Sequence, residues 1–329
     1  MEKSPTPDNE KLKAKKESLY HRPCSVCGSE KSRLLFMKDD FRFVKCKDCG
    51  FVYVDPSLRA STLKDYYEET KEDYWKDQTT AKFRSLLKKK FNDELAFVEK
   101  CAKKGKVLDI GCGAGIFLYH AKSRGWKVYG TEFNKFSRNF IKSKLHIQNI
   151  FPGNMDQFKN DYFELVTIHQ CFEHLPDPNK MLDDINRILQ EKGVLFISVP
   201  NIYGITTRIL GKESGHFDIE HLNYFNRKNF RSMLEKHGFE VLSFKTEGMK
   251  IESVLRFIRS KLTFNKAKKK EDPQVENKII SKMQANNLSN NIYFRAYYYA
   301  CSVLNLFLFG DYLIVLARKK KKQNTKKNK

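Results

Sequence analysis

Three glycines and one acid occur together in the stretch VLDIGCGAGIF, residues 107–117. The acid and the glycines are Asp109, Gly111, Gly113 and Gly115. The dinucleotide pattern G-x-G-x-x-G is not met because Ile116 stands at its third glycine position, and no Gly-Lys-Ser/Thr follows to form a P-loop. A carboxylate at such a turn repels a pyrophosphate and attracts a cation. The loop therefore predicts a positively charged ligand without phosphate, with a tight turn that binds no ligand as the alternative.

This arrangement resembles the first motif of the class I S-adenosylmethionine-dependent methyltransferases. The resemblance implies S-adenosylmethionine as cofactor and methyl donor, held by Asp109 and the three glycines. Glu132 ends the next apolar run, 17 residues beyond Gly115. The family uses an acid at that point to accept hydrogen bonds from the ribose hydroxyls. Asn154 and Met155 stand where the family contacts adenine.

A second group of polar residues follows the apolar run 162–170, in a stretch that resembles a methyltransferase subgroup through its Glu-His pair, Pro-Asp-Pro and Val-Pro-Asn. The group consists of His169, Glu173 and His174. Open α/β sheets bind ligands at the carboxyl ends of their strands, so we expect these residues at the acceptor site. A neutral imidazole, with a pKa of about 6.5, suits a general base. Positioning of the acceptor and metal binding are the alternatives.

The metal alternative comes from a resemblance to ubiquinone-pathway O-methyltransferases, which have Glu-x-x-Glu-His at this point and use similar residues for a divalent ion. Gln170 replaces the first carboxylate here, so no magnesium site is predicted. Polar and aromatic residues also crowd the segment 215–230, where His216, His221 and Tyr224 suit an acceptor pocket. Packing of the aromatic side chains in the core is the alternative there.

Two cysteine pairs near the amino terminus have metal-ligand spacing. Cys24 and Cys27 are separated from Cys46 and Cys49 by 18 residues, which is typical of a zinc ribbon. Four thiolates leave Zn²⁺ no open position, so the ion would be structural. An iron–sulfur or redox role is the alternative. The segment also resembles the zinc knuckles that precede many bacterial methyltransferase domains.

Short apolar runs alternate with amphipathic segments from residue 106 onward, which predicts a parallel sheet covered on both faces. We expect a doubly wound, mostly parallel, seven-stranded Rossmann-like α/β sheet with an N-terminal zinc ribbon. A helix is expected over 178–193, followed by a strand over 193–201. The predicted units are a Lys-rich lead (1–20), the ribbon (21–55), a helical linker (56–104), a methyltransferase domain (105–318) with an insertion (246–310), and a basic tail (319–329).

The formal net charge of +23 comes largely from Lys-rich segments at 256–270 and 318–329. Such runs are typical of solvated tails and also attract anionic lipid headgroups. Residues 292–309 are the most membrane-like segment, but they contain Arg295 and Asn305, which favour a packed or interfacial helix. No secretory signal is evident, so a cytoplasmic location is expected, with the inner face of the membrane as an alternative.

Nucleic acid is disfavoured as a partner, because the fourth strand is not followed by an Asn-Pro-Pro-Tyr-like tetrapeptide and no Pro-Cys nucleophile is present. We therefore expect methyl transfer to a hydroxyl or carbon of a small-molecule, sugar or lipid-linked glycan acceptor. An RNA or protein methyltransferase that binds its polymer through the ribbon and basic tails is one alternative. A catalytically silent zinc-ribbon binding module is the other.

Overall fold

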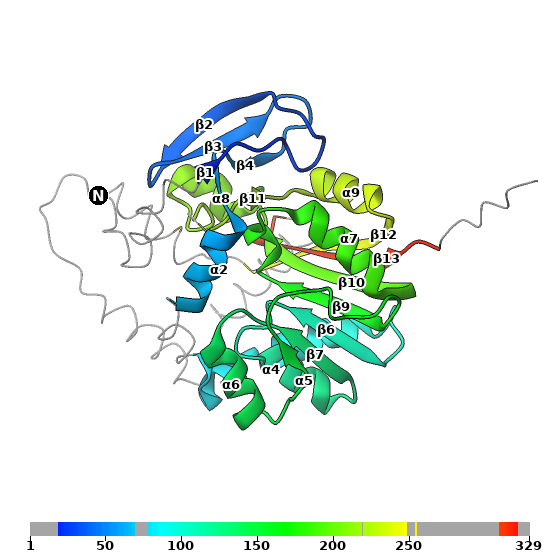
Figure 1. The fold of residues 1–329 in the computed structure, drawn as a ribbon. Helices are drawn as coiled ribbons and strands as arrows, with labels where there is room; N and C mark the ends of the chain where they lie inside the picture. The colour runs from blue at the N-terminus through cyan, green and yellow to red at the C-terminus, as the bar shows by residue number, and fades with distance from the viewer. Residues whose placement is uncertain (1–18, 70–77, 219, 249–253, 255–308, 322–329) are drawn as a thin grey trace, which may run out of the picture.

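A seven-stranded sheet forms the centre of the computed structural model, which describes residues 19–69, 78–218, 220–248, 254 and 309–321 (Figure 1). Its strand order is β12-β13-β10-β9-β6-β7-β8. The strands are β6 Lys106–Ile110, β7 Lys127–Thr131, β8 Ile150–Phe151, β9 Phe163–His169, β10 Leu189–Pro200, β12 Phe239–Glu247 and β13 Tyr312–Lys319. The pairs from β10 to β8 are parallel, and only β13 runs antiparallel to its two neighbours.

Helices cover both faces of this sheet. The first face carries α4 (Ala81–Val98), α5 (Ile116–Ser123) and α6 (Lys135–Lys144), whose apolar side chains share one core with the strands. The second face carries α7 (Pro178–Ile188) and α9 (Arg227–Lys236), which belong to a second core. A strand with both faces covered is buried along its length, as β6 is. The doubly wound, mostly parallel α/β fold predicted from the sequence is confirmed.

The helix expected over 178–193 ends earlier than predicted. Leu189 leaves the helix in an extended conformation, with φ −72° and ψ 138°. It is fully buried and pairs with Phe163, so β10 begins there and not at Gly193. The register of β10 against β9 shifts between Leu189 and Val194. Burial of one leucine against the neighbouring strand thus outweighs the helical pattern of the residues that follow it.

The cysteine-rich segment forms a separate four-stranded sheet in the order β11-β4-β3-β2 (Figure 1). Its strands are β2 Ser32–Lys38, β3 Phe41–Cys46, β4 Val52–Val54 and β11 Asn223–Tyr224, and a short pair, β1 Leu19–Tyr20 with β5 Ser57–Leu58, lies beside them. The contribution of β11 was not predicted. The buried guanidinium of Arg22 joins the two parts, since it donates to the carbonyl oxygen of Leu222 at 2.7 Å and to Asn223 at 3.0 Å. The cysteine sheet is therefore attached to the segment that holds His216 and His221.

The remaining helices of the described residues are α2 (Ala60–Glu69), α8 (Ile205–Leu210) and two 3-10 helices, η2 (Phe172–His174) and η3 (Gly211–Glu213). Most of the predicted lead (1–20), insertion (246–310) and basic tail (319–329) lies outside the described residues, as does the segment 292–309 except for its last residue. Within the described part of the chain, no helix has the length and apolar character needed to cross a membrane.

Candidate active site

The glycine loop joins β6 to α5 at the carboxyl end of the sheet. Gly111, Gly113 and Gly115 have φ angles of 69°, 53° and 71°, a region that glycine enters without strain. A Cβ added at Gly111 would lie 2.6 Å from Sγ of Cys171. The loop after β9 therefore packs directly against the glycine loop, and a side chain has no room there.

Glu132 follows β7, and its carboxylate reaches back to the glycine loop. Oε2 accepts a hydrogen bond from the backbone N–H of Gly113 at 2.9 Å, and Oε1 accepts one from Asn134 N–H at 2.8 Å. Burial raises the pKa of Glu132, against the opposing effect of these backbone donors. A carboxylate has about four lone-pair sites, so ribose hydroxyls could still donate to it. The structure brings Glu132 to the loop; its contact with a ribose stays a prediction.

Asp109 lies beneath the glycine loop and is 2% exposed. Its Oδ1 accepts a hydrogen bond from Thr167 Oγ1 at 2.8 Å. Burial, reinforced by the nearby charge of Glu132, raises the pKa of Asp109 to about 8. A cation in this site would favour the ionised carboxylate.

Asn154 and Met155 follow β8, which lies on the opposite side of β6 and its glycine loop from β9. The exposed Asn154 accepts a hydrogen bond from Asp156 N–H at 2.9 Å. Met155 is 3% exposed and packs in the core, and its carbonyl oxygen accepts from Arg187 at 2.9 Å. Both residues are near the expected strand end, and their contact with adenine stays a prediction.

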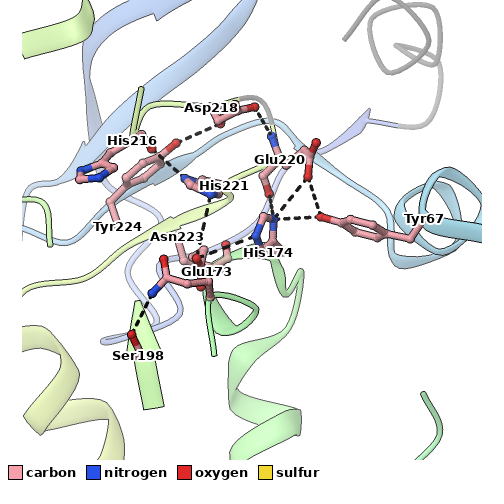
Figure 2. A network of polar contacts seen from close by, with 11 residues as sticks. Tyr67, Glu173, His174, Ser198, His216, Asp218, Glu220, His221, Asn223 and Tyr224 are labelled. Atoms are coloured by element: carbon pink, nitrogen blue, oxygen red, sulfur yellow. Dashed lines mark hydrogen bonds and ion pairs between the residues drawn. The ribbon is translucent and has the colours of Figure 1, made fainter. Parts of the chain in front are cut away.

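Glu173 and His174, which follow β9, belong to a network of imidazoles, carboxyl groups and phenols that also includes residues of α2 and of the segment 216–224 (Figure 2). The Tyr67 hydroxyl is 2.9 Å from Nδ1 of His174 and donates to Glu220 Oε2 at 3.0 Å. The His174 and His221 rings are 4.8 Å apart, centroid to centroid. We call Tyr67, Glu173, His174, Glu220 and His221 the histidine cluster.

The backbone determines which nitrogen carries the proton in both neutral imidazoles. Nδ1 of His174 lies 3.0 Å from the carbonyl oxygen of Glu220, and Nδ1 of His221 lies 2.7 Å from that of His216. A carbonyl oxygen only accepts, so each Nδ1 carries the hydrogen and each Nε2 presents a lone pair. The two Nε2 atoms face Glu173 Oε1 at 3.9 and 4.0 Å. Two basic nitrogens therefore converge on one carboxyl group.

Glu173 is 1% exposed, and neither of its carboxyl oxygens has a hydrogen-bond partner among the residues that the structure describes. Burial raises the pKa of Glu173 to about 8. Glu173, His174 and His221 place one ligand atom each within 4.8 Å of one another. One carboxylate and two imidazoles suit a transition metal better than magnesium. Metal binding therefore remains an alternative, with a transition metal in place of magnesium.

The other two predicted histidines lie elsewhere. His169 is surrounded by the rings of Phe117 and Phe196, with centroids 4.6 and 5.2 Å away, and faces Asp109. His216 is 3% exposed, and its Nδ1 lies 3.1 Å from the Thr207 hydroxyl. Of the five residues predicted to be catalytic, the structure brings together Glu173, His174 and His221. His169 instead lies beside Asp109, beneath the glycine loop, and His216 contacts His221 through its carbonyl oxygen.

The four predicted zinc ligands converge. Sγ of Cys24 is 3.5 Å from Sγ of Cys49, and Sγ of Cys27 is 3.6 Å from Sγ of Cys46. All four lie within 4.8 Å of one another. Backbone amides of Gly28 and Gly50 close the two turns by donating to the carbonyl oxygens of Cys24 and Cys46. This cluster of four thiols fits a tetrahedral metal ion.

Sequence reasoning missed Tyr67 and Glu220 in the histidine cluster. Glu220 had a signal, because it forms with His221 a second Glu-His pair like Glu173 and His174. Tyr67 had no such signal, because α2 is far in sequence from the other residues of the cluster and its tyrosines resemble core residues.

The doubly wound sheet, the three-glycine loop and the acid after the next strand define a class I methyltransferase fold. Residues 81–244 match the model of a methyltransferase domain family. The chain is 28% identical over 112 residues to the ubiquinone biosynthesis O-methyltransferase of Pasteurella multocida, covering 29% of this chain and 46% of that protein. It is 28% identical over 162 residues to the C-methyltransferase NovU of Streptomyces niveus, covering 46% and 36%.

The chain thus spans less than half the length of these two curated relatives. Among solved structures, it is similar to an S-adenosylmethionine-dependent methyltransferase from Archaeoglobus fulgidus, with 21% identity, a TM-score of 0.47, and coverage of 72% of this chain and 94% of that one. Through the domain at 81–244, the chain belongs to the class I S-adenosylmethionine-dependent methyltransferases.

Proposed function

We propose that the protein transfers a methyl group from S-adenosylmethionine to a hydroxyl or carbon of a small-molecule acceptor. The donor would extend along the sheet edge in the strand order β8-β7-β6-β9. Asn154 and Met155, after β8, would contact adenine, and Glu132, after β7, the ribose. Gly111, Gly113 and Gly115 would allow close backbone approach, with the cationic end beside Asp109.

The histidine cluster would receive the acceptor. In the proposed step, Nε2 of His221 or His174 removes a proton from the acceptor O–H or C–H. The electron pair left on the acceptor attacks the methyl carbon, and the carbon–sulfur bond breaks to leave a neutral thioether. The positive charge of the resulting imidazolium, about 4 Å from Glu173, would favour ionisation of that carboxyl group, and the carboxylate would in turn stabilise the imidazolium. Alignment of the two reactants supplies much of the remaining rate.

One observation carries this proposal: Tyr67 contacts both halves of the site. Its carbonyl oxygen accepts a hydrogen bond from Asn134 Nδ2 at 3.2 Å, two residues after Glu132. Its hydroxyl lies 2.9 Å from His174. These two contacts of Tyr67 support the proposal that a donor on the glycine loop and an acceptor at the histidine cluster would lie beside each other.

A small-molecule acceptor is supported by relatives named as a ubiquinone biosynthesis O-methyltransferase and a C-methyltransferase. Hydroxyl and activated carbon acceptors share the need for a base, which the histidine cluster provides. A sugar or lipid-linked glycan as acceptor, and attraction of the Lys-rich segments to an anionic membrane surface, belong to the same proposal.

The test uses the full chain, S-adenosylmethionine labelled in its methyl group, and a fractionated cell extract. Label should enter the small-molecule fraction. His221→Ala should lower that rate by about 10²- to 10⁴-fold, as expected for loss of a general base, while donor binding is kept. The control is His21→Ala, whose side chain is 75% exposed. Label in RNA or protein would contradict the acceptor class, and an undiminished rate in His221→Ala would contradict the base.

We also propose that Cys24, Cys27, Cys46 and Cys49 hold one structural Zn²⁺. The support is the convergence of four thiols in two glycine-closed turns. Such a shell has no open coordination position, so the ion would take no part in methyl transfer. It would instead hold the sheet to which β11 and the loop of His221 are attached.

A further inference from the structure

Three titratable side chains from three elements, β9, α4 and β6, meet beneath the glycine loop. The imidazole of His169, at the end of β9, lies between two carboxyl groups. Its Nδ1 is 3.6 Å from Oε2 of Glu94 in α4, and its Nε2 is 3.8 Å from Oδ1 of Asp109 in β6. Both distances exceed the length of a hydrogen bond, so the imidazole lies close to each carboxyl group without a hydrogen bond to either.

These groups are buried, and of the three only Asp109 has a hydrogen-bond partner, Thr167, in the described part of the chain. Glu94 is 5% exposed and Asp109 is 2% exposed. Among the residues that the structure describes, neither carboxyl oxygen of Glu94 and neither ring nitrogen of His169 has a hydrogen-bond partner. Buried polar atoms are nearly always satisfied, and those left unsatisfied call for a ligand, water or ion. The cluster is therefore incomplete without a further polar or charged group.

The strand order indicates which group completes it. With the ribose of the donor at Glu132 after β7, the rest of the molecule runs across β6 toward β9. Asp109 and His169 stand on those two strands. The sulfonium and ammonium of the donor are at that end, and a cation fits a site that holds two carboxyl groups.

We propose that Glu94, His169 and Asp109 form a proton-sharing cluster, so that binding of the donor's cationic end drives protons from the carboxyl groups into the solvent. The inference rests on the proposed function. Glu94 becomes a positioning residue that tunes donor affinity, and the neutral imidazole of His169 lies between the two carboxyl groups. The methyl-transfer step itself does not involve them.

The charge states agree with this role. Burial raises the pKa of Glu94 to about 8, as it does for Asp109, and lowers the pKa of His169 to about 3. The other charged or titratable groups that act on the three are Lys90, Glu247 and Glu132. Lys90 is 3.8 Å from Glu94 but also 3.2 Å from Glu247, so it does not neutralise Glu94 alone. Near pH 7 the empty cluster holds protonated carboxyls, which a bound cation would ionise.

Titration calorimetry of the full chain with S-adenosylmethionine tests this. At pH 7 the enthalpy is measured in phosphate and in Tris, because buffers of different ionisation enthalpy reveal released protons. Because both carboxyl groups would ionise, we expect release of between about one and two protons per donor bound, and a donor Kd that falls by about tenfold to a hundredfold per pH unit between pH 6.5 and 7.5. The wild-type measurement requires no variant to fold.

Glu94→Gln should bind the donor with fewer released protons and a flatter pH dependence. Asp93→Asn, at an exposed neighbouring position of α4, should match the wild type. Buffer-independent enthalpy in the wild type, or unchanged proton release in Glu94→Gln, would overturn the inference while leaving the proposed function intact. Absence of any donor binding would overturn both.

Discussion

The Tyr67 hydroxyl lies 2.9 Å from Nδ1 of His174, although the two residues are 107 positions apart in the chain. Because His174 Nδ1 also faces the carbonyl oxygen of Glu220, the phenol oxygen shares the Nδ1 hydrogen and donates its own proton to the Glu220 carboxylate. The ring is thereby fixed with Nε2 toward Glu173. α2 thus contributes to the site although it precedes the methyltransferase domain match.

Removal of that hydroxyl should impair transfer without unfolding the protein. Tyr67→Phe loses a hydrogen bond to His174, one of the two proposed bases, and we expect a rate about tenfold lower, equivalent to about 1.4 kcal/mol. Tyr66→Phe is the matched control, because the Tyr66 hydroxyl donates to the same Glu220 at 2.9 Å. Rates of label transfer at saturating donor measure the difference. Equal losses in the two variants would show that the contact with His174 has no role.

Two glycine substitutions distinguish the cost of a positive φ angle from the cost of a steric clash with a neighbouring side chain. Gly111→Ala and Gly125→Ala both place a side chain at positive φ, 69° and 88°, at a cost of about 1–2 kcal/mol. Only at Gly111 does the new Cβ meet another side chain, Cys171 Sγ at 2.6 Å, whereas nothing lies within 4 Å at Gly125. Overpacking should cost Gly111→Ala about 1–3 kcal/mol more. Urea unfolding gives both values, and equal losses would contradict the close packing of the two loops.

The cysteine cluster should contain metal. Elemental analysis of the purified chain should find one zinc per molecule, and Cys46→Ser should lose the ion together with about 2 kcal/mol or more of stability. Cys101→Ser, outside the cluster, should keep both. Iron in place of zinc would favour the redox alternative. Full metal content in Cys46→Ser would show that the four thiols are not the binding site.

Stability should depend on pH through Glu173. Its pKa is about 8 in the folded chain and about 4.3 in the unfolded chain. Between these two pH values the folded state therefore binds more protons than the unfolded state. The stabilisation is complete below about pH 4.3 and is lost as the pH rises toward 8, at about 1.4 kcal/mol per pH unit.

Glu173→Gln mimics the neutral acid and should flatten this dependence between pH 6 and 7.5, relative to the wild type. The exposed Glu191→Gln should follow the wild type. Urea unfolding of the three proteins at each pH measures the slopes. A Glu173→Gln slope as steep as that of the wild type would assign the pH dependence to other groups.

The sequence predicted the parts of this molecule that depend on local pattern. Alternating apolar runs and amphipathic segments indicated the doubly wound sheet. The spacing of Asp109 and its three glycines indicated the glycine loop. Cysteine spacing alone predicted which four thiols meet. These patterns are readable because period and spacing constrain the backbone directly.

What depends on tertiary packing was not predictable. Tyr67 and Glu94 come from helices whose docking no local pattern specifies, so neither was a candidate. His169 shared a segment with His174, yet strand geometry turns it toward Asp109 and α4. Strand β11 pairs with β4, although more than 160 residues separate the two strands in the chain. A strand of two residues has no sequence pattern that indicates such a pairing.

Saturable donor binding tests the central claim most directly. The full chain should bind one S-adenosylmethionine per molecule, measured by calorimetry, and Glu132→Ala should weaken that binding about tenfold to a hundredfold through loss of hydrogen bonds to a charged group. Glu240→Ala, at an exposed position of β12, should bind as the wild type does. Failure of the wild type to bind the donor, or undiminished affinity in Glu132→Ala, would contradict the account of this site.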